Sequence, residues 1–205
     1  MTDVLFRHIL AGTAIVLMLA ACGAEPPAAE APEGPPAPSA PSAPSVASVT
    51  AQGWGPLRVG MTIPEITAAL GPDSDPNADG GADPTICDQF RPERAPEGLI
   101  VMVENGRLSR ISLINAGTLK TDRGFGIGDT AAAIKAAYGA NAVASPHKYR
   151  EAPAEYITAW SGAAPPADAP MPDSARGIVY EIGEDGRVAM IHAGGPSIGY
   201  VEGCS

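Results

Sequence analysis

The chain repeats one spacing of apolar residues in two segments. Residues 58–71 read RVGMTIPEITAALG, and residues 126–139 read GIGDTAAAIKAAYG. In both segments the apolar side chains recur every three or four residues, as on the buried face of a helix. The side chains that form this stripe are Ile63, Ile66 and Leu70 in the first segment and Ile134 and Tyr138 in the second. The pattern predicts two short amphipathic helices.

The residues that flank these stripes are of the types that begin and end helices. Thr62 and Thr130 can accept hydrogen bonds from the first free backbone N–H groups, and Glu65 completes a capping box with Thr62. Gly71 and Gly139 stand where a helix commonly ends in a left-handed residue. We therefore expect each helix to begin after its threonine and to end before its glycine.

Strand-like segments follow each predicted helix. The segment VENGRLSRI (103–111) is matched by GEDGRVAMI (183–191), with apolar residues on both sides of an Asn-Gly or Asp-Gly pair. Such pairs predict two-residue hairpin turns in which both central residues take a positive φ. A further strand is predicted before each hairpin, at 86–90 (ICDQF) and 156–160 (YITAW).

These elements define a unit that cannot enclose a core by itself. A short helix with one apolar stripe and three strands leaves too much apolar surface in water, whereas two such units can share one sheet. We therefore expect an α+β fold: two tandem helix-plus-antiparallel-strand repeats, 49–119 and 120–205, form one continuous sheet with both helices on one face. The second repeat has the longer loop, 161–174, which is rich in Pro and Ala and is expected on the surface.

The first residues predict the compartment. The apolar run 9–19 is about eleven residues long, too short for a bilayer span of roughly twenty and typical of a signal peptide. It ends in LAAC (19–22), which resembles the cleavage site of bacterial lipoprotein signals. The resemblance implies that residues 1–21 are removed and that Cys22 carries acyl chains, which anchor it stably to a membrane. The alternative is an ordinary secreted protein in which Cys22 is incidental.

The residues next to Cys22 predict how the anchor holds the folded part. Gly23 stands where an aspartate would resemble an inner-membrane retention signal, so we expect the outer membrane, facing the periplasm or the cell surface. Residues 22–48 consist almost entirely of Pro, Ala, Ser, Glu and Gly, with no aromatic side chain. This composition cannot bury enough apolar surface to fold. It predicts an extended tether rather than a Pro-rich ligand for a partner module.

The repeated unit resembles the tandem-repeat domains of β-lactamase-inhibitor-like proteins and of small outer-membrane lipoproteins of barrel assembly. Their repeats open with a G-M-T-x-x-E/Q-hydrophobic helix, as in VGMTIPEITAALG (59–71) and more loosely in IGDTAAAIKAAYG (127–139). The segments ICDQF…VMVENGRLSRI and YVEGCS are also similar to a group of bacterial lipoproteins. The resemblance implies a concave sheet face for protein contact opposite the helices. It carries over no individual binding residue.

Cys87 and Cys204 are the two cysteines left once Cys22 is lipidated. Beyond the inner membrane the compartment is oxidising, so we expect a disulfide between them. It would fasten a C-terminal strand to the first repeat. A catalytic or metal-binding thiol is the weaker hypothesis, because neither cysteine has a CxxC neighbour or a Cys/His cluster.

The charge of the chain argues against one class of partner. The 13 Lys and Arg residues are outnumbered by 23 Asp and Glu residues, for a net charge of −10. The basic residues form no stripe and do not alternate with aromatic side chains. Nucleic acid is therefore not an expected partner.

Two segments formally match functional loops. GPSIG (195–199) has the residues of a nucleophile elbow, but neither a helix pattern nor a histidine follows it, so we expect a turn. A second segment has the spacing of a calcium loop, yet Ile86 stands where the bidentate Glu is required. We expect a solvated loop there, with calcium binding as the alternative. Its candidate ligands are Asp75, Asn77, Asp79 and Asp83.

The histidines and the absence of a catalytic motif complete the functional prediction. His147 in a polar loop and His192 on a strand are expected to be packed or surface residues rather than ligands. We predict no catalytic residue, metal or cofactor. The predicted function is that of a membrane-anchored, non-catalytic envelope lipoprotein that binds another protein through the open sheet face. The alternatives are a small envelope hydrolase and a structural lipoprotein without a specific partner.

Overall fold

The computed structural model describes residues 47–78, 80–115, 117–165 and 171–204. The described residues all belong to one compact unit, Ala43–Ser205. The predicted signal peptide, Cys22 and most of the predicted tether lie outside the described residues. In the part of the chain that the structure describes, no helix has the length and apolar character needed to cross a membrane.

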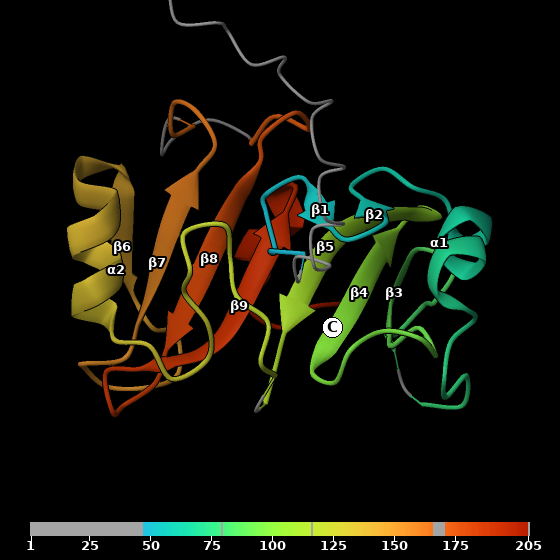
Figure 1. The fold of residues 1–205 in the computed structure, drawn as a ribbon, viewed down its shortest axis with the longest axis horizontal. Helices are drawn as coiled ribbons and strands as arrows, with labels where there is room; N and C mark the ends of the chain where they lie inside the picture. Colours follow the sequence, from blue (N-terminus) through green and yellow to red (C-terminus); the bar gives the residue numbers. More distant parts are fainter. Residues whose placement is uncertain (1–46, 79, 116, 166–170, 205) are drawn as a thin grey trace, which may run out of the picture. The chain divides into compact units, whose positions relative to one another are not determined.

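The described part is α+β, with two α-helices and mostly antiparallel strands (Figure 1). Helices α1 (Ile63–Leu70) and α2 (Ala131–Tyr138) lie where the sequence predicts them. Two short 3₁₀ helices, η1 and η2, span Gly139–Asn141 and Pro196–Gly199. The strands are β1 (Gly53–Trp54), β2 (Leu57–Arg58), β3 (Cys87–Phe90), β4 (Leu99–Glu104), β5 (Arg107–Leu113), β6 (Ala142–Pro146), β7 (Glu155–Trp160), β8 (Gly177–Ile182) and β9 (Val188–Gly194).

The ends of both α-helices agree with the predicted caps. The Glu65 carboxylate accepts a hydrogen bond from the backbone N–H of Thr62 at 2.7 Å, as in a capping box. The Thr130 hydroxyl accepts one from a backbone N–H in the first turn of α2 at 3.3 Å. Gly71 and Gly139 follow the helices with φ of 86° and 55°. Each helix is therefore bounded by local sequence signals.

The described strands form two sheets, so the expectation of one continuous sheet is wrong in part. β1 and β2 pair only with each other, and the remaining strands form a seven-stranded sheet of order β3-β4-β5-β9-β8-β7-β6. The central pair β5–β9 joins the strands that follow α1 to those that follow α2. β1 and β2 are two residues each, too short to show an alternating pattern in the sequence.

The two hairpin turns differ. Asn105 and Gly106 connect β4 to β5 with φ of 48° and 73°, the two-residue turn that the Asn-Gly pair predicts. In the second hairpin only Gly186 takes a positive φ, of 73°, and Asp185 does not. The last strand pair of this hairpin is Ile182 with Val188, so a longer turn links β8 to β9 and the prediction of a two-residue turn is wrong there.

One face of the seven-stranded sheet is apolar and contributes most of the core. Side chains of both α-helices and of β2 pack into the same buried cluster as the strand residues of this face. α2 lies against β6 and β7, and α1 contacts β5 (Figure 1). Fully buried members of the cluster are Val49, Leu57, Ile66, Leu99, Val101, Ile111, Leu113, Ile134, Ile157, Tyr180, Ile182 and Ile191.

The residues after β9 cross the opposite face instead of forming the predicted C-terminal strand. At Gly194 the backbone comes so close to β5 that a Cβ atom would lie 2.3 Å from the Ser109 carbonyl oxygen, and the chain then turns into η2. η2 contacts β5, β8 and β9. The predicted disulfide is confirmed: Cys204 is bonded to Cys87 of β3. We call residues 195–204 the C-terminal strap.

Candidate functional site

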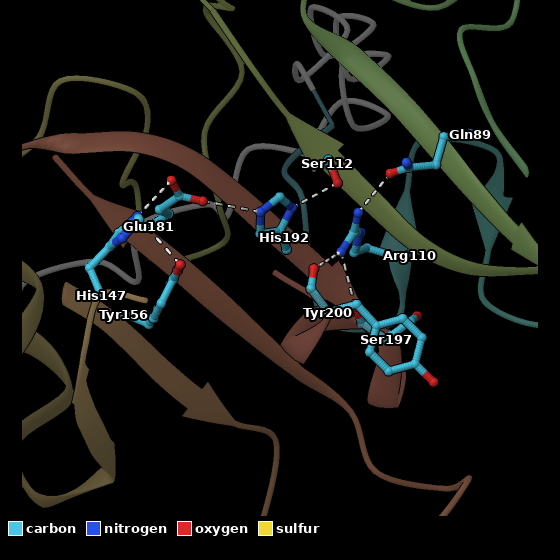
Figure 2. Close-up of polar contacts among 9 residues, drawn as sticks. All are labelled: Gln89, Arg110, Ser112, His147, Tyr156, Glu181, His192, Ser197 and Tyr200. Carbon is cyan, nitrogen blue, oxygen red and sulfur yellow. Dashed lines mark hydrogen bonds and ion pairs between the residues drawn. The ribbon is translucent and has the colours of Figure 1, made fainter. Parts of the chain in front are cut away.

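Polar side chains converge on the sheet face beneath the C-terminal strap (Figure 2). Because strand side chains alternate between faces, the residues between the core positions of β5, β8 and β9 point here. Ser112 pairs directly with His192 across β5 and β9, and Glu181 pairs with Tyr156 across β8 and β7. Because β8 also pairs with β9, these strands bring a serine, a histidine, a carboxylate and a tyrosine together.

Arg110 fastens the strap to this face. The residue is 3% exposed, and its guanidinium donates to the carbonyl oxygens of Ser197 and Tyr200, at 3.0 and 2.9 Å. It also donates to the side-chain oxygen of Gln89 at 2.7 Å. Burial lowers the pKa of Arg110 to about 10, so it stays charged at neutral pH. The structure thus holds a buried cation against backbone carbonyls rather than against a carboxylate.

Glu181 lies between the two histidines of the described chain. Its Oε1 is 3.2 Å from Nε2 of His147, and its Oε2 is 3.8 Å from Nε2 of His192. The His192 ring beside it, and more weakly that of His147, hold the pKa of Glu181 below its ordinary value against the opposing effect of burial. Burial also lowers the pKa of His192. At neutral pH, Glu181 is therefore a carboxylate and His192 beside it is a neutral imidazole.

Further contacts hold both imidazoles in place. The Ser112 hydroxyl lies 2.8 Å from Nδ1 of His192, and the Tyr156 ring stacks on His147 with the ring centroids 4.7 Å apart. Glu181 is therefore flanked by rings whose orientation is set by packing and hydrogen bonds, which is the arrangement expected of a preorganised site.

A cavity of about 190 Å³ opens beside Glu181. It lies between β6–β9 and the strap, and Tyr200 and Val201 on its rim are 47% and 40% exposed. A larger hollow of about 910 Å³ lies along residues 144–155, which run from the end of β6 to the start of β7, but this single stretch of chain forms its walls. We take the smaller cavity as the candidate site, because side chains from several strands converge on it.

Ser112, His192 and Glu181 are the residue types of a hydrolytic triad. A nucleophile must reach its substrate, however, and Ser112 is 2% exposed and does not line the cavity. Ser197 of the GPSIG segment is 1% exposed and lies in η2, which no helix follows in the described chain. The arrangement can bind and orient a ligand, but it presents neither of these serine hydroxyls to the cavity.

The sequence-predicted calcium loop lies apart from this cavity. The Asp83 carboxylate accepts hydrogen bonds from the backbone and hydroxyl of Thr85, at 3.0 and 2.6 Å, and Asp79 lies outside the described residues. Within the described ranges no group of three or more His, Cys, Asp or Glu side chains is placed to hold a metal ion.

Sequence reasoning missed the cluster around Glu181. One signal was present in the sequence: Arg110 and Ser112 alternate with apolar residues on β5, and Glu181 alternates with apolar residues on β8. This alternation indicates that the three polar side chains share one face. The register of the four strands β5, β7, β8 and β9 was needed to show which of them meet. His147 also belongs to the cluster, although it lies in the loop after β6.

Comparison of the chain with protein-family models, with curated proteins and with solved structures found no match. The resemblance to β-lactamase-inhibitor-like and barrel-assembly lipoproteins therefore stays a prediction based on short motifs.

Proposed function

We propose that this chain is a membrane-anchored, non-catalytic envelope lipoprotein that binds a partner protein at the polar face of its seven-stranded sheet. The observation that carries the proposal is the cavity beside Glu181, with a buried carboxylate at its base and the exposed side chains Tyr200 and Val201 at its rim. A polar group set inside a rim of aromatic and aliphatic side chains is typical of binding sites.

The fold proposal is that the domain arose by duplication of a helix-plus-strand unit, with boundaries near 49–119 and 120–205. Equivalent contacts in the two halves support it. The guanidinium of Arg107 donates to the carbonyl of Gly60 at 3.0 Å, and that of Arg187 donates to the carbonyl of Gly128 at 2.8 Å. In both halves, the arginine after the hairpin turn therefore holds the loop that enters the helix.

The anchoring part of the proposal rests on the sequence around Cys22. Replacing the attachment thiol, Cys22→Ser, should abolish acylation and processing of the lipoprotein kind. Metabolic labelling of cells with a fatty-acid probe measures this directly. Equal labelling of the variant and the wild type would contradict the anchor and leave an ordinary secreted protein.

Partner binding is tested by photo-crosslinking in cells. A photoreactive amino acid at Tyr200, on the rim of the cavity, should give a discrete covalent adduct with a partner. The matched control is the same amino acid at Ala136, which is exposed on α2 at the opposite face. Adducts of equal yield at both positions, or none at Tyr200, would contradict binding at the polar face; the second result would favour a structural lipoprotein.

A further inference from the structure

We propose that the cavity beside Glu181 binds a protonated primary amine, with the Glu181 carboxylate as its counter-ion. The inference rests on the proposed function, because this cavity belongs to the proposed binding face, and it adds the chemical class of the bound group. The amine can be the side chain of a lysine on a partner polypeptide or a free small amine, and both would make the same contacts.

The charge of the cavity wall selects a cation. Glu181 is the only lining residue with a formal charge at neutral pH, since all ten residues that line the cavity are described and none is Lys or Arg. His192, which also lines it, is kept neutral by burial, which lowers its pKa. Arg110, the nearby cation, is turned toward the carbonyls of the strap. An anion would therefore meet a carboxylate, whereas an ammonium group would gain a partner in a partly water-excluded site.

The Glu181 carboxylate has acceptor capacity left for such a group. Its Oε1 lies 3.2 Å from Nε2 of His147, and its Oε2 lies 3.8 Å from Nε2 of His192. An ionised carboxylate can accept about four hydrogen bonds, so these two neighbours leave acceptor sites for an ammonium group. Hydroxyls of Tyr156 and Thr158 line the same cavity and can accept the remaining ammonium protons.

The size and apolar walls of the cavity fit a short alkyl chain. A volume of about 190 Å³ corresponds to about six water molecules at roughly 30 Å³ each. Val179 and Ile198 line it, and the ring of Tyr200 stands at its rim, where an aromatic face can attract a cation. A lysine side chain or a butylamine has this combination of an ammonium head and a short apolar stem.

The test is an NMR titration of the full-length chain in neutral detergent at pH 8, above the range in which an imidazole charges. The probes are n-butylammonium, the neutral analogue n-butanol, and Nα-acetyl-lysine N-methylamide. We expect saturable shifts with an amine and at least tenfold weaker binding of n-butanol. Saturation by the lysine amide alone would assign the amine to a polypeptide, and saturation by n-butylammonium alone would assign it to a small molecule.

Two variants and one control locate the binding. Glu181→Gln should weaken amine binding at least tenfold, whereas Glu184→Gln, the same change at an exposed turn residue, should leave it unchanged. Ser145→Trp keeps the carboxylate but fills the cavity from the exposed edge strand β6, and should also abolish binding even if Glu181→Gln does not fold.

Three results would overturn the inference: equal binding of n-butanol and n-butylammonium, no saturable binding of either amine, or full binding by Ser145→Trp. None of them would remove an adduct at the photoreactive residue 200 in cells. Failure of the amine chemistry is therefore distinguishable from failure of the proposed function.

Discussion

The two faces of the seven-stranded sheet are built from different side chains. On one face aliphatic residues such as Ile111 and Ile157 pack under α1, α2 and β2. On the other face Arg110, Glu181 and His192 lie under the C-terminal strap. Burial of apolar surface stabilises a fold, whereas a buried charged group is costly unless it is well paired and is weak evidence of stability. The first face therefore maintains the fold, and the second face is the one that we propose for binding.

The largest expected effect comes from producing the two halves of the chain as separate fragments, because both halves contribute to the apolar face. The buried cluster takes residues from both halves of the described chain, so neither 49–119 nor 120–205 should fold alone. We expect each fragment to be unfolded or aggregated, while 49–205 unfolds in one cooperative step. NMR amide dispersion of the three fragments measures this. A well-dispersed spectrum from either half would show that the apolar face is two separate cores.

The next largest effect on stability comes from the C-terminal strap, which crosses the polar face. The Cys87–Cys204 disulfide closes a sequence separation of 117 residues. In the chain-entropy model its loss removes about 4–5 kcal/mol of unfolding free energy. Denaturant unfolding of Cys204→Ser should show a loss approaching this size, and the oxidised wild type should have no titratable thiol at either position. Two free thiols in the natively isolated protein would contradict the account of the strap.

Two neighbouring residues of β7 sharpen the comparison between the faces. Ile157 is fully buried in the apolar cluster, whereas Thr158, the next residue, lines the cavity on the other face. Ile157→Ala should lower the unfolding free energy by about 2–5 kcal/mol, because it leaves a cavity in the core. Thr158→Ala should lower it by less than about 1 kcal/mol. Similar losses in the two variants would mean that the faces do not divide stability and binding as proposed.

The smallest effect is a pH dependence that arises on the polar face. The pKa of His192 is lowered from its ordinary value of 6.5 by burial, with Arg110 acting in the same direction and Glu181 opposing it. The folded state then binds fewer protons than the unfolded chain, so stability is full above pH 6.5 and falls as the pH drops toward the lowered value. Urea unfolding between pH 8 and pH 5 measures this. His192→Gln should flatten the curve, and an unchanged slope in that variant would assign the effect to another group.

Local signals account for the parts of the fold that the sequence predicted. The threonines and glycines around the helices, the Asn105-Gly106 turn and the disulfide each depend on neighbouring residues or on the compartment. β6 was not predicted, because it lies at the edge of the sheet with mostly exposed side chains and has no apolar alternation.

The candidate site was the part that sequence reasoning could not place. Glu181 meets His147, which lies 34 residues away, and Arg110 meets Ser197, which lies 87 residues away. Contacts of this kind depend on strand order and register, which the spacing of polar residues does not contain. The strap was missed for a related reason: a glycine- and proline-rich ending shows that a strand stops, but not which face the chain then crosses.

The division between the two faces is tested most directly by measuring adduct yield and unfolding free energy on the same variants. With the photoreactive residue at position 200, Glu181→Gln should at least halve the yield of the partner adduct while the chain stays folded at the assay temperature. Ile111→Val should lower the unfolding free energy by about 0.5–1.5 kcal/mol and leave the yield unchanged. An adduct that persists unchanged in Glu181→Gln, or that falls equally in Ile111→Val, would contradict the division between a binding face and a stabilising face.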